Sequence, residues 1–226
     1  MNPSQATTYY SANLDRFLAD FDRIAGKYLK PALSVRYKDT DTDKVLDLAR
    51  DRYKELILAL PDIGGDNNPL TYDLTSCVPM LALYQALKSF DKDPLDSGVI
   101  FNEVFEQLYA SGDMGSAEEL KQKGASMFTP KSYEETKKLA DFLKLKIYPE
   151  NFVFSFVEGD GKNFDFGWDF SECAIIKFFK RYGAEALVPY ACKLDFVESR
   201  YCKTGLKREH TLAGGGPKCD FRFKKQ

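Results

Sequence analysis

The chain has 226 residues, of which 44% are hydrophobic and 29% are charged, as is usual for a globular protein of one large or two small domains. Its 32 basic and 34 acidic residues leave a formal net charge of −2, which excludes a strongly basic footprint for nucleic acid or an anionic membrane. No apolar run is long enough to span a bilayer, and the first residues lack the basic flank and apolar core of a secretory signal. We therefore expect a cytoplasmic location and neither a nucleic-acid nor a membrane partner.

Helical spacing of apolar residues dominates the first two thirds of the chain. It predicts helices over Tyr10–Leu29, over Val45–Leu60 after the capping cluster Asp39–Asp43, over Leu74–Phe90, from the pair Asp93-Pro94 onward, and from a capping box at Ser132 to about Leu143. We expect five or six helices before Pro149.

After Pro149 the apolar residues alternate instead, which is typical of strands. The pattern predicts one hairpin with an aromatic face, a helix, and a final hairpin across a glycine turn: strands Phe152–Val157 and Phe164–Trp168, helix Asp169–Tyr182, and strands Leu206–Leu212 and Cys219–Phe223. The fold class is therefore α+β, with an N-terminal helical region followed by a small antiparallel β-sheet with packed helices. We treat residues 1–226 as a single domain, helical over about 7–145 and β-rich over about 150–226.

The cysteines are too few and too scattered for a disulfide scaffold. There are five, an odd number, and no CxxC pair occurs, which favours reduced thiols: Cys77, Cys173, Cys192, Cys202 and Cys219. The chain has a single histidine, His210, which argues against a structural zinc site. We expect no metal and no cofactor.

Residues able to carry chemistry gather between Glu172 and Phe223. On the expected strand Leu206–Leu212, Arg208 and His210 share a face with the two leucines because side chains on a strand alternate. If Leu212 pairs with Cys219 across the turn, the guanidinium and the thiol face a common pocket, whereas a one-residue slip separates them. A cysteine in that setting is expected to have a cationic or polar neighbour that lowers its pKa.

Structural readings of the same residues stay open. Cys219 lies between phenylalanines on its face and is typical of a small core side chain. Arg208 is equally explained by a buried carboxylate partner such as Asp195. Glu172 stands three residues after Asp169, the spacing of a capping box. Cys192 and Asp195 share a face if their segment is helical.

Several motifs taken together resemble the L-2-amino-thiazoline-4-carboxylic acid hydrolase family. They are Glu172-Cys173, the run Pro189 to Asp195, Arg208 to Gly215, and the closing Cys219-Asp220-Phe221-Arg222-Phe223, with Leu60 to Gly65 and Leu81 to Lys88 in the helical half. The resemblance covers most of the chain from about Arg50. At position 209 this chain has glutamate where the family more often has threonine.

The resemblance implies a hydrolase that opens a cyclic amidine, 2-aminothiazoline-4-carboxylate, to N-carbamoyl-cysteine by attack of a thiolate or an activated water at the ring carbon. The catalytic candidates are Cys219, Cys173, Asp195 and Cys192. The candidates for substrate binding are Arg208, His210 and Glu172, with the arginine fork suited to a substrate carboxylate. The expected partner is thus a small molecule with a carboxylate, and homo-oligomerisation stays open.

The β-rich end also resembles small-molecule-binding domains related to 4-vinyl reductases, some of which hold a metal or a hydrophobic ligand without catalysis. On that alternative, three cysteines with a carboxylate or His210 would be zinc ligands, although their spacing is wide.

Overall fold

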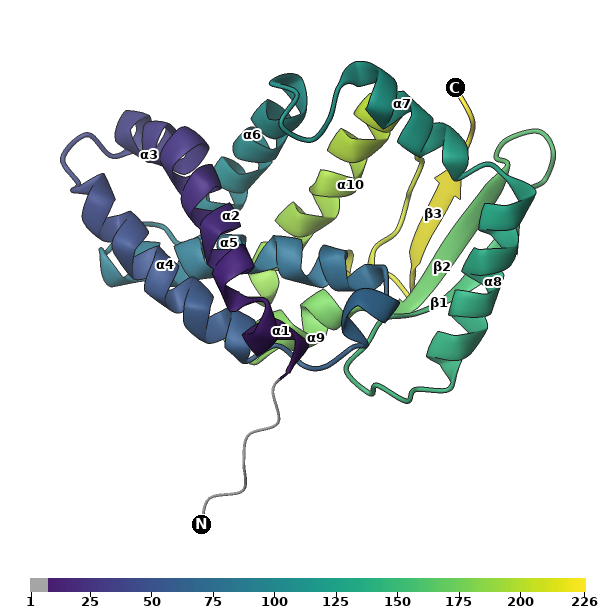
Figure 1. The fold of residues 1–226 in the computed structure, drawn as a ribbon, viewed down its shortest axis with the longest axis horizontal. Coiled ribbons are helices and arrows are strands. Elements are labelled where there is room, and N and C mark those ends of the chain that lie inside the picture. The colour runs from purple at the N-terminus through teal and green to yellow at the C-terminus, as the bar shows by residue number, and fades with distance from the viewer. Residues whose placement is uncertain (1–7) are drawn as a thin grey trace, which may run out of the picture. The chain divides into compact units, whose positions relative to one another are not determined.

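The computed structural model describes residues 8–226 of the chain (Figure 1). The chain folds as two compact units, the first ending at Phe101 and the second running from Asn102 to Gln226. The single functional domain over residues 1–226 that the sequence suggests stays a prediction. No helix within residues 8–226 is both long and apolar enough to cross a membrane.

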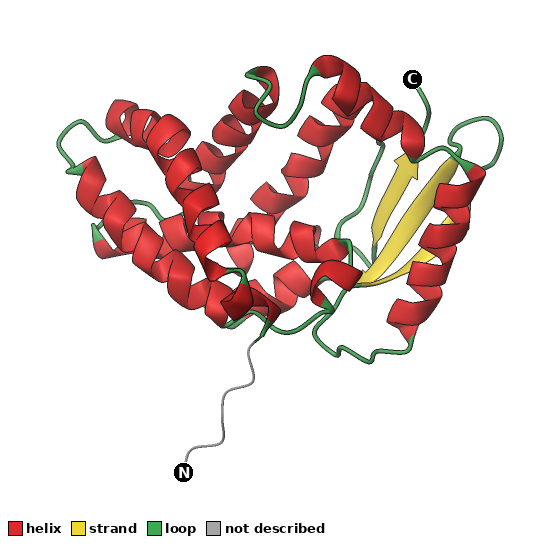
Figure 2. Cartoon of the chain, in the orientation of Figure 1, coloured by secondary structure: helices red, strands yellow, loops and turns green. Residues whose placement is uncertain are grey.

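The first unit is helical in its described part (Figure 2). Its elements are α1 (Tyr9–Ala12), α2 (Leu14–Ile24), the π-helical turn η1 (Ala25–Leu29), α3 (Lys30–Arg36), α4 (Thr42–Leu58), the 3-10 turn η2 (Gly65–Asn67) and α5 (Leu70–Ser89), and α6 (Asp96–Ala110) begins within it. Its core lies around α5, most of whose side chains from Leu74 to Leu87 are buried, and Phe21 of α2 stacks on Tyr53 of α4 at 4.8 Å between ring centroids.

The second unit combines helices with a sheet. Its elements are the end of α6, α7 (Ala117–Ser126), α8 (Pro130–Lys144), β1 (Val153–Glu158), β2 (Phe166–Glu172), α9 (Ala174–Lys180), the 3-10 turn η3 (Glu185–Leu187), α10 (Val188–Cys202), the 3-10 turn η4 (Leu212–Gly214) and β3 (Cys219–Phe223). The three strands form one antiparallel sheet in the order β1-β2-β3. The α+β class expected from the sequence is confirmed.

One face of the sheet is almost entirely aromatic, as the alternating pattern predicts. Cross-strand partners on this face match ring to ring, except where Cys219 meets Phe170: Phe154 with Phe170, Phe156 with Trp168, Trp168 with Phe221, and Phe166 with Phe223. Such pairs stabilise a sheet beyond the area they bury. Helix α8 covers the β1 side of this face through Tyr133, whose ring centroid lies 5.7 Å from that of Phe156 in β1 and 5.0 Å from that of Phe166 in β2.

Helix α7 packs against α10 at a glycine. A β-carbon on Gly124 would lie 1.7 Å from the carbonyl oxygen of Cys202, so only glycine allows this approach. Ser116 and Glu119 form a full capping box at the start of α7. Beside it, Lys123 of α7 binds Glu198 of α10 at 2.7 Å.

Two expected elements are wrong. Residues 169–172 continue β2 rather than starting a helix, because Phe170 completes the aromatic alternation of Phe166 and Trp168, and α9 begins only at Ala174. The expected strand Leu206–Leu212 reduces to a single bridge between Lys207 and Arg222. There the carboxylate of Asp220 accepts the backbone N–H groups of residues 209 and 210, which removes the donors a ladder needs.

The helical expectations differ from the structure mainly at their ends. Among the described residues, eight α-helices precede Pro149 rather than five or six, because the helical stretch Tyr9–Arg36 is broken by Asn13 and by the π-helical turn. Helix α8 begins at Pro130 with Thr129 as its cap, so Ser132 is not the capping residue. Helix α6 begins at Asp96, after Asp93 has accepted the N–H of Leu95.

Candidate functional site

Helix α10 presents three neighbouring side chains of the candidate site. Asp195 and Phe196 stand three and four residues after Cys192, the spacing that places side chains next to one another on a helix face. The shared face expected for Cys192 and Asp195 is therefore confirmed, because their segment is helical. Burial raises the pKa of both Cys192 and Asp195.

Arg208 lies between α10 and β3, and its guanidinium is closed in on several sides. Nη1 donates to Oδ2 of Asp195 at 2.6 Å, and Nη2 donates to the backbone carbonyl of Cys192. The guanidinium carbon lies 5.0 Å from the ring centroid of Phe196 and 4.6 Å from that of Phe221. Only 3% of the side chain is exposed, so its charge is held by protein groups, as an interior arginine requires.

Asp195 combines a fixed carboxyl group with an open side. Its side chain keeps 41% of its surface exposed, and Oδ1 accepts no hydrogen bond from the described residues. Although the side chain is partly exposed, the protein packed around the carboxyl group desolvates it and raises the pKa of Asp195 to about 6; Arg208 acts in the opposite direction, and the negative charge of Glu198 adds to the rise. This carboxyl group is therefore ionised at neutral pH but holds a proton more strongly than an ordinary aspartate.

Three thiols surround this pair closely enough to interact with it electrostatically. Burial raises the pKa of Cys173 and of Cys192 to about 12 and also raises the pKa of Cys219. Arg208 works against the rise at Cys192 and Cys219, and the backbone N–H of Leu212 donates to Sγ of Cys219 at 3.2 Å. The cationic neighbour expected for a cysteine is thus present, but the expected fall in pKa is wrong, because burial outweighs it.

Cys77 and Cys202 are buried outside this group, and all five cysteines, each within residues 8–226, are thiols rather than halves of disulfides.

Glu172 is turned toward lysines instead of this group. Lys146 binds it at 2.5 Å, and Lys177 binds its other oxygen while also donating to the carbonyls of Pro149 and Asn151. Hydrogen bonds from Lys146 and Lys177 lower the pKa of Glu172. Its role in this structure is to join the end of β2 to α9 and the loop before β1.

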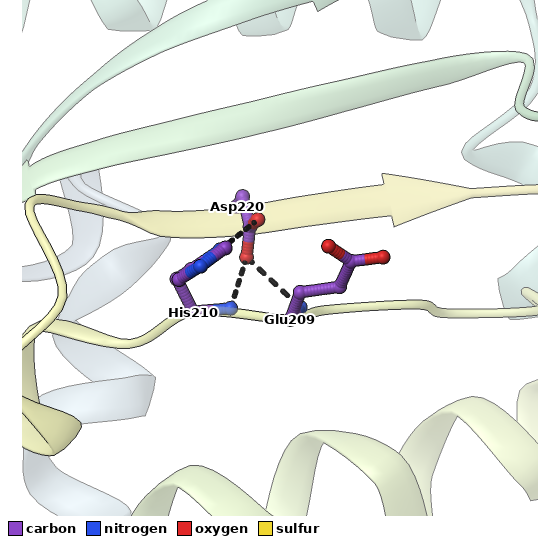
Figure 3. A group of neighbouring side chains, drawn as sticks. All are labelled: Glu209, His210 and Asp220. Carbon is purple, nitrogen blue, oxygen red and sulfur yellow. Dashed lines mark hydrogen bonds and ion pairs between the residues drawn. The ribbon is translucent and has the colours of Figure 1, made fainter.

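His210 points away from Arg208 and is exposed. Its Nδ1 lies 3.0 Å from Oδ2 of Asp220, and Oδ1 of Asp220 accepts the backbone N–H groups of Glu209 and His210 at 3.0 and 2.7 Å (Figure 3). Arg208 and His210 therefore do not share a face. Ladder pairing is lost after Lys207, and His210 therefore turns toward the face of the sheet opposite the aromatic one. This polar face carries Asp169, Asp220 and Arg222.

One group of possible metal ligands is found within residues 8–226. It consists of Glu209, His210 and Asp220, whose donor atoms lie within 4.8 Å of one another. Every contact of Asp220 in this group is explained by its bonds to the loop 209–210. The cysteines do not form such a group with Asp195 or His210, so the zinc-binding alternative finds no support in this arrangement.

A groove of about 630 Å³ lies elsewhere in the second unit. It is lined by Glu106, Ala117, Glu118, Lys121, Arg200, Tyr201 and Lys203. Glu106 binds both Arg200 and Tyr201, and none of the residues selected from the sequence lies there.

Sequence reasoning missed two members of the site. Phe196 stands four residues after Cys192, so helical spacing alone places it on the same face. The N–H of Leu212 belongs to a 3-10 turn that the strand assignment hid. The structure thus brings together Cys173, Cys192, Asp195, Arg208 and Cys219, while Glu172 and His210 lie apart.

The described architecture is that of an α+β protein with an acid–thiol site beside an aromatic sheet. The family model for L-2-amino-thiazoline-4-carboxylic acid hydrolase matches residues 80–223, which is more than half of the chain and includes every residue of this site. The chain belongs to this family. Comparison with curated proteins and with solved structures gave no match.

Proposed function

We propose that the protein is a hydrolase that opens a cyclic amidine such as 2-aminothiazoline-4-carboxylate, with Asp195 as the general base. The observation that carries the proposal is the state of Asp195: a carboxyl group fixed through one oxygen, open at the other, with a pKa raised to about 6. A base with a pKa just below the working pH is largely ionised and still accepts a proton well. The name of the family supports hydrolysis of this ring.

The chemistry needs one water and one base. Water adds to the ring carbon between nitrogen and sulfur while Asp195 takes one of its two protons, and the other proton passes from the new hydroxyl group to the ring nitrogen. The carbon–sulfur bond then breaks, since a thiolate leaves more readily than an amide nitrogen, and the sulfur receives the proton that Asp195 holds. The sum is one water consumed and N-carbamoyl-cysteine formed.

The thiols are the alternative nucleophiles, and their raised pKa values argue against them in the resting protein. Cys173 and Cys192, with pKa values raised to about 12, are almost entirely protonated near neutral pH, and only the thiolate attacks well. Cys219 is closest to activation, through Leu212 and Arg208, but its pKa is raised as well. Activated water is therefore the route we favour over thiolate attack.

The test is to supply 2-aminothiazoline-4-carboxylate to the purified protein and identify N-carbamoyl-cysteine by mass spectrometry. We expect kcat/KM to fall about tenfold per pH unit below an apparent pKa of about 6, because the protonated carboxyl of Asp195 is inactive as a base. A rate that rises only above pH 8 would instead assign the reaction to a thiolate. Absence of product at every pH contradicts the proposal.

A further inference from the structure

The buried cation of the site is not accessible to a ligand. Arg208 already binds Asp195 and the carbonyl of Cys192, and aromatic rings of Phe196 and Phe221 lie against its guanidinium. With 3% of its side chain exposed, a ligand carboxylate would have to displace Asp195 to reach it. The sequence-based role of Arg208 as the clamp of a substrate carboxylate therefore conflicts with its contacts.

The charge balance points the same way. Among the described residues, Arg208 is the one cation that acts on Asp195, and Glu198 adds a second negative charge. The charge of Arg208 is thus matched by Asp195, and no other cation among the described residues acts on this carboxylate. An anionic group placed beside Oδ1 of Asp195 would lose its hydration without gaining a counter-charge.

The open acceptor suits a different kind of group. Oδ1 of Asp195 is an ionised hydrogen-bond acceptor on a partly exposed side chain, beside the partly exposed Cys192 and the ring of Phe196. Groups that bring N–H donors or a positive charge are favoured there, since hydrogen bonds to a charged acceptor are among the stronger ones. A protonated cyclic amidine carries both.

We infer that the site recognises the amidine end of its substrate, as a neutral or cationic group beside Asp195, and holds no place for a carboxylate at Arg208, which is a positioning residue for Asp195. The inference rests on the proposed hydrolysis and narrows its substrate class. Cyclic amidines are taken with or without a ring carboxylate, and any carboxylate they carry stays toward solvent.

The test compares affinities by titration calorimetry at pH 7.5, using rings without the cleavable carbon–sulfur bond of an aminothiazoline. The probes are 2-aminoimidazoline, 2-aminoimidazoline-4-carboxylate and thiazolidine-4-carboxylate, which keeps the acid but lacks the amidine. A carboxylate held by arginine contributes at least about tenfold in affinity. We expect the two amidines to bind within about threefold of each other and the amidine-free acid to bind at least about tenfold more weakly.

Variants separate this inference from the proposed function. Asp195→Asn is expected to weaken both amidines about tenfold, whereas Asp169→Asn, whose carboxylate pairs with Lys218 and Arg222 on the opposite face of the sheet, keeps their affinity. Turnover is followed separately, as free thiol released from 2-aminothiazoline-4-carboxylate. Amidine binding through Asp195 without turnover contradicts the hydrolysis and upholds the inference. Turnover together with a carboxylate that adds tenfold or more to affinity, or no amidine binding at all, overturns it.

Discussion

The two faces of the sheet carry the same kind of ion pair in different surroundings. On the aromatic face, Arg208 is 3% exposed and stacks on Phe221 while it binds Asp195. On the opposite face, Arg222 binds Asp169 at 2.9 Å, and both side chains keep more than a fifth of their surface exposed. The residue types are the same in both pairs, so burial of the arginine is what separates them.

The acids of the two faces differ in the hydrogen-bond donors around them. Burial raises the pKa of Asp195, on the side of the aromatic face. Burial opposes ionisation of Asp220 as well, but hydrogen bonds from the His210 side chain and from the backbone outweigh it and lower the pKa of Asp220. A carboxylate surrounded by donors stays ionised and unreactive, and one that lacks donors on an open side is able to exchange protons.

The largest effect is expected when the acid of each face is changed in turn. Asp195→Asn removes the base and should lower kcat about a thousandfold, within the range of general-base catalysis. Asp169→Asn is the matched control, because it removes a carboxylate that only pairs with Lys218 and Arg222. Equal losses of kcat in the two folded variants would remove the distinction between the faces.

The next effect concerns the two arginines and is measured as free energy of unfolding in urea. Arg208→Met leaves the Cys192 carbonyl and the half-exposed Asp195 without the buried guanidinium and should cost about 3 kcal/mol, the lower end of the range for breaking a buried pair. Arg222→Met on the polar face should cost less, about 1 kcal/mol or below. If Arg208→Met lowers the free energy of unfolding no more than Arg222→Met does, the burial of Arg208 adds nothing to stability.

The substitution Arg208→Lys keeps the charge and loses the fork. If Arg208 positions Asp195, this variant should move the acid limb of the kcat/KM profile to higher pH, because the hydrogen bond from Arg208 opposes the rise in the pKa of Asp195. A role limited to stability would lower the melting temperature and leave the acid limb in place.

Asp195 and Asp220, on the two faces of the sheet, should make stability depend on pH with opposite signs. Asp195 has a folded pKa of about 6 against 3.8 in the unfolded chain, so the native state binds its proton more strongly and loses stability as pH rises between these values. Asp220 has a lowered folded pKa, so its contribution is present above 3.8 and is lost as pH falls through the folded value.

Melting temperatures from pH 3 to pH 7 test this contrast. Relative to the unchanged protein, Asp195→Asn should gain stability as pH rises, and Asp220→Asn should lose it. Parallel curves for the two variants would contradict the assignment.

Sequence periodicity predicted what depends on neighbours along the chain. The aromatic face follows from alternation through Phe154 and Trp168, and the shared face of Cys192 and Asp195 follows from helical spacing. What it missed depends on contacts across the chain: Asp220 replaces the ladder bonds expected for residues 206–212, which turns His210 away from Arg208. Glu172 was misplaced for the same reason, since Lys146 and Lys177 bind it from outside its strand.

The smallest effect is expected at the thiol that lies on the aromatic face itself. Cys219 is buried opposite Phe170, and its sulfur accepts the N–H of Leu212. Cys219→Ser keeps an acceptor of similar size in the same place, so Leu212 stays bonded. If water is the nucleophile, kcat should remain within about tenfold of the unchanged protein, a barrier difference of about 1.4 kcal/mol.

Cys219→Ala, which removes the acceptor, is the matched variant and should fall further in stability than in kcat. A loss of kcat for Cys219→Ser as large as that for Asp195→Asn, at an unchanged melting temperature, would mean that the buried face supplies the nucleophile and that Asp195 serves to deprotonate it.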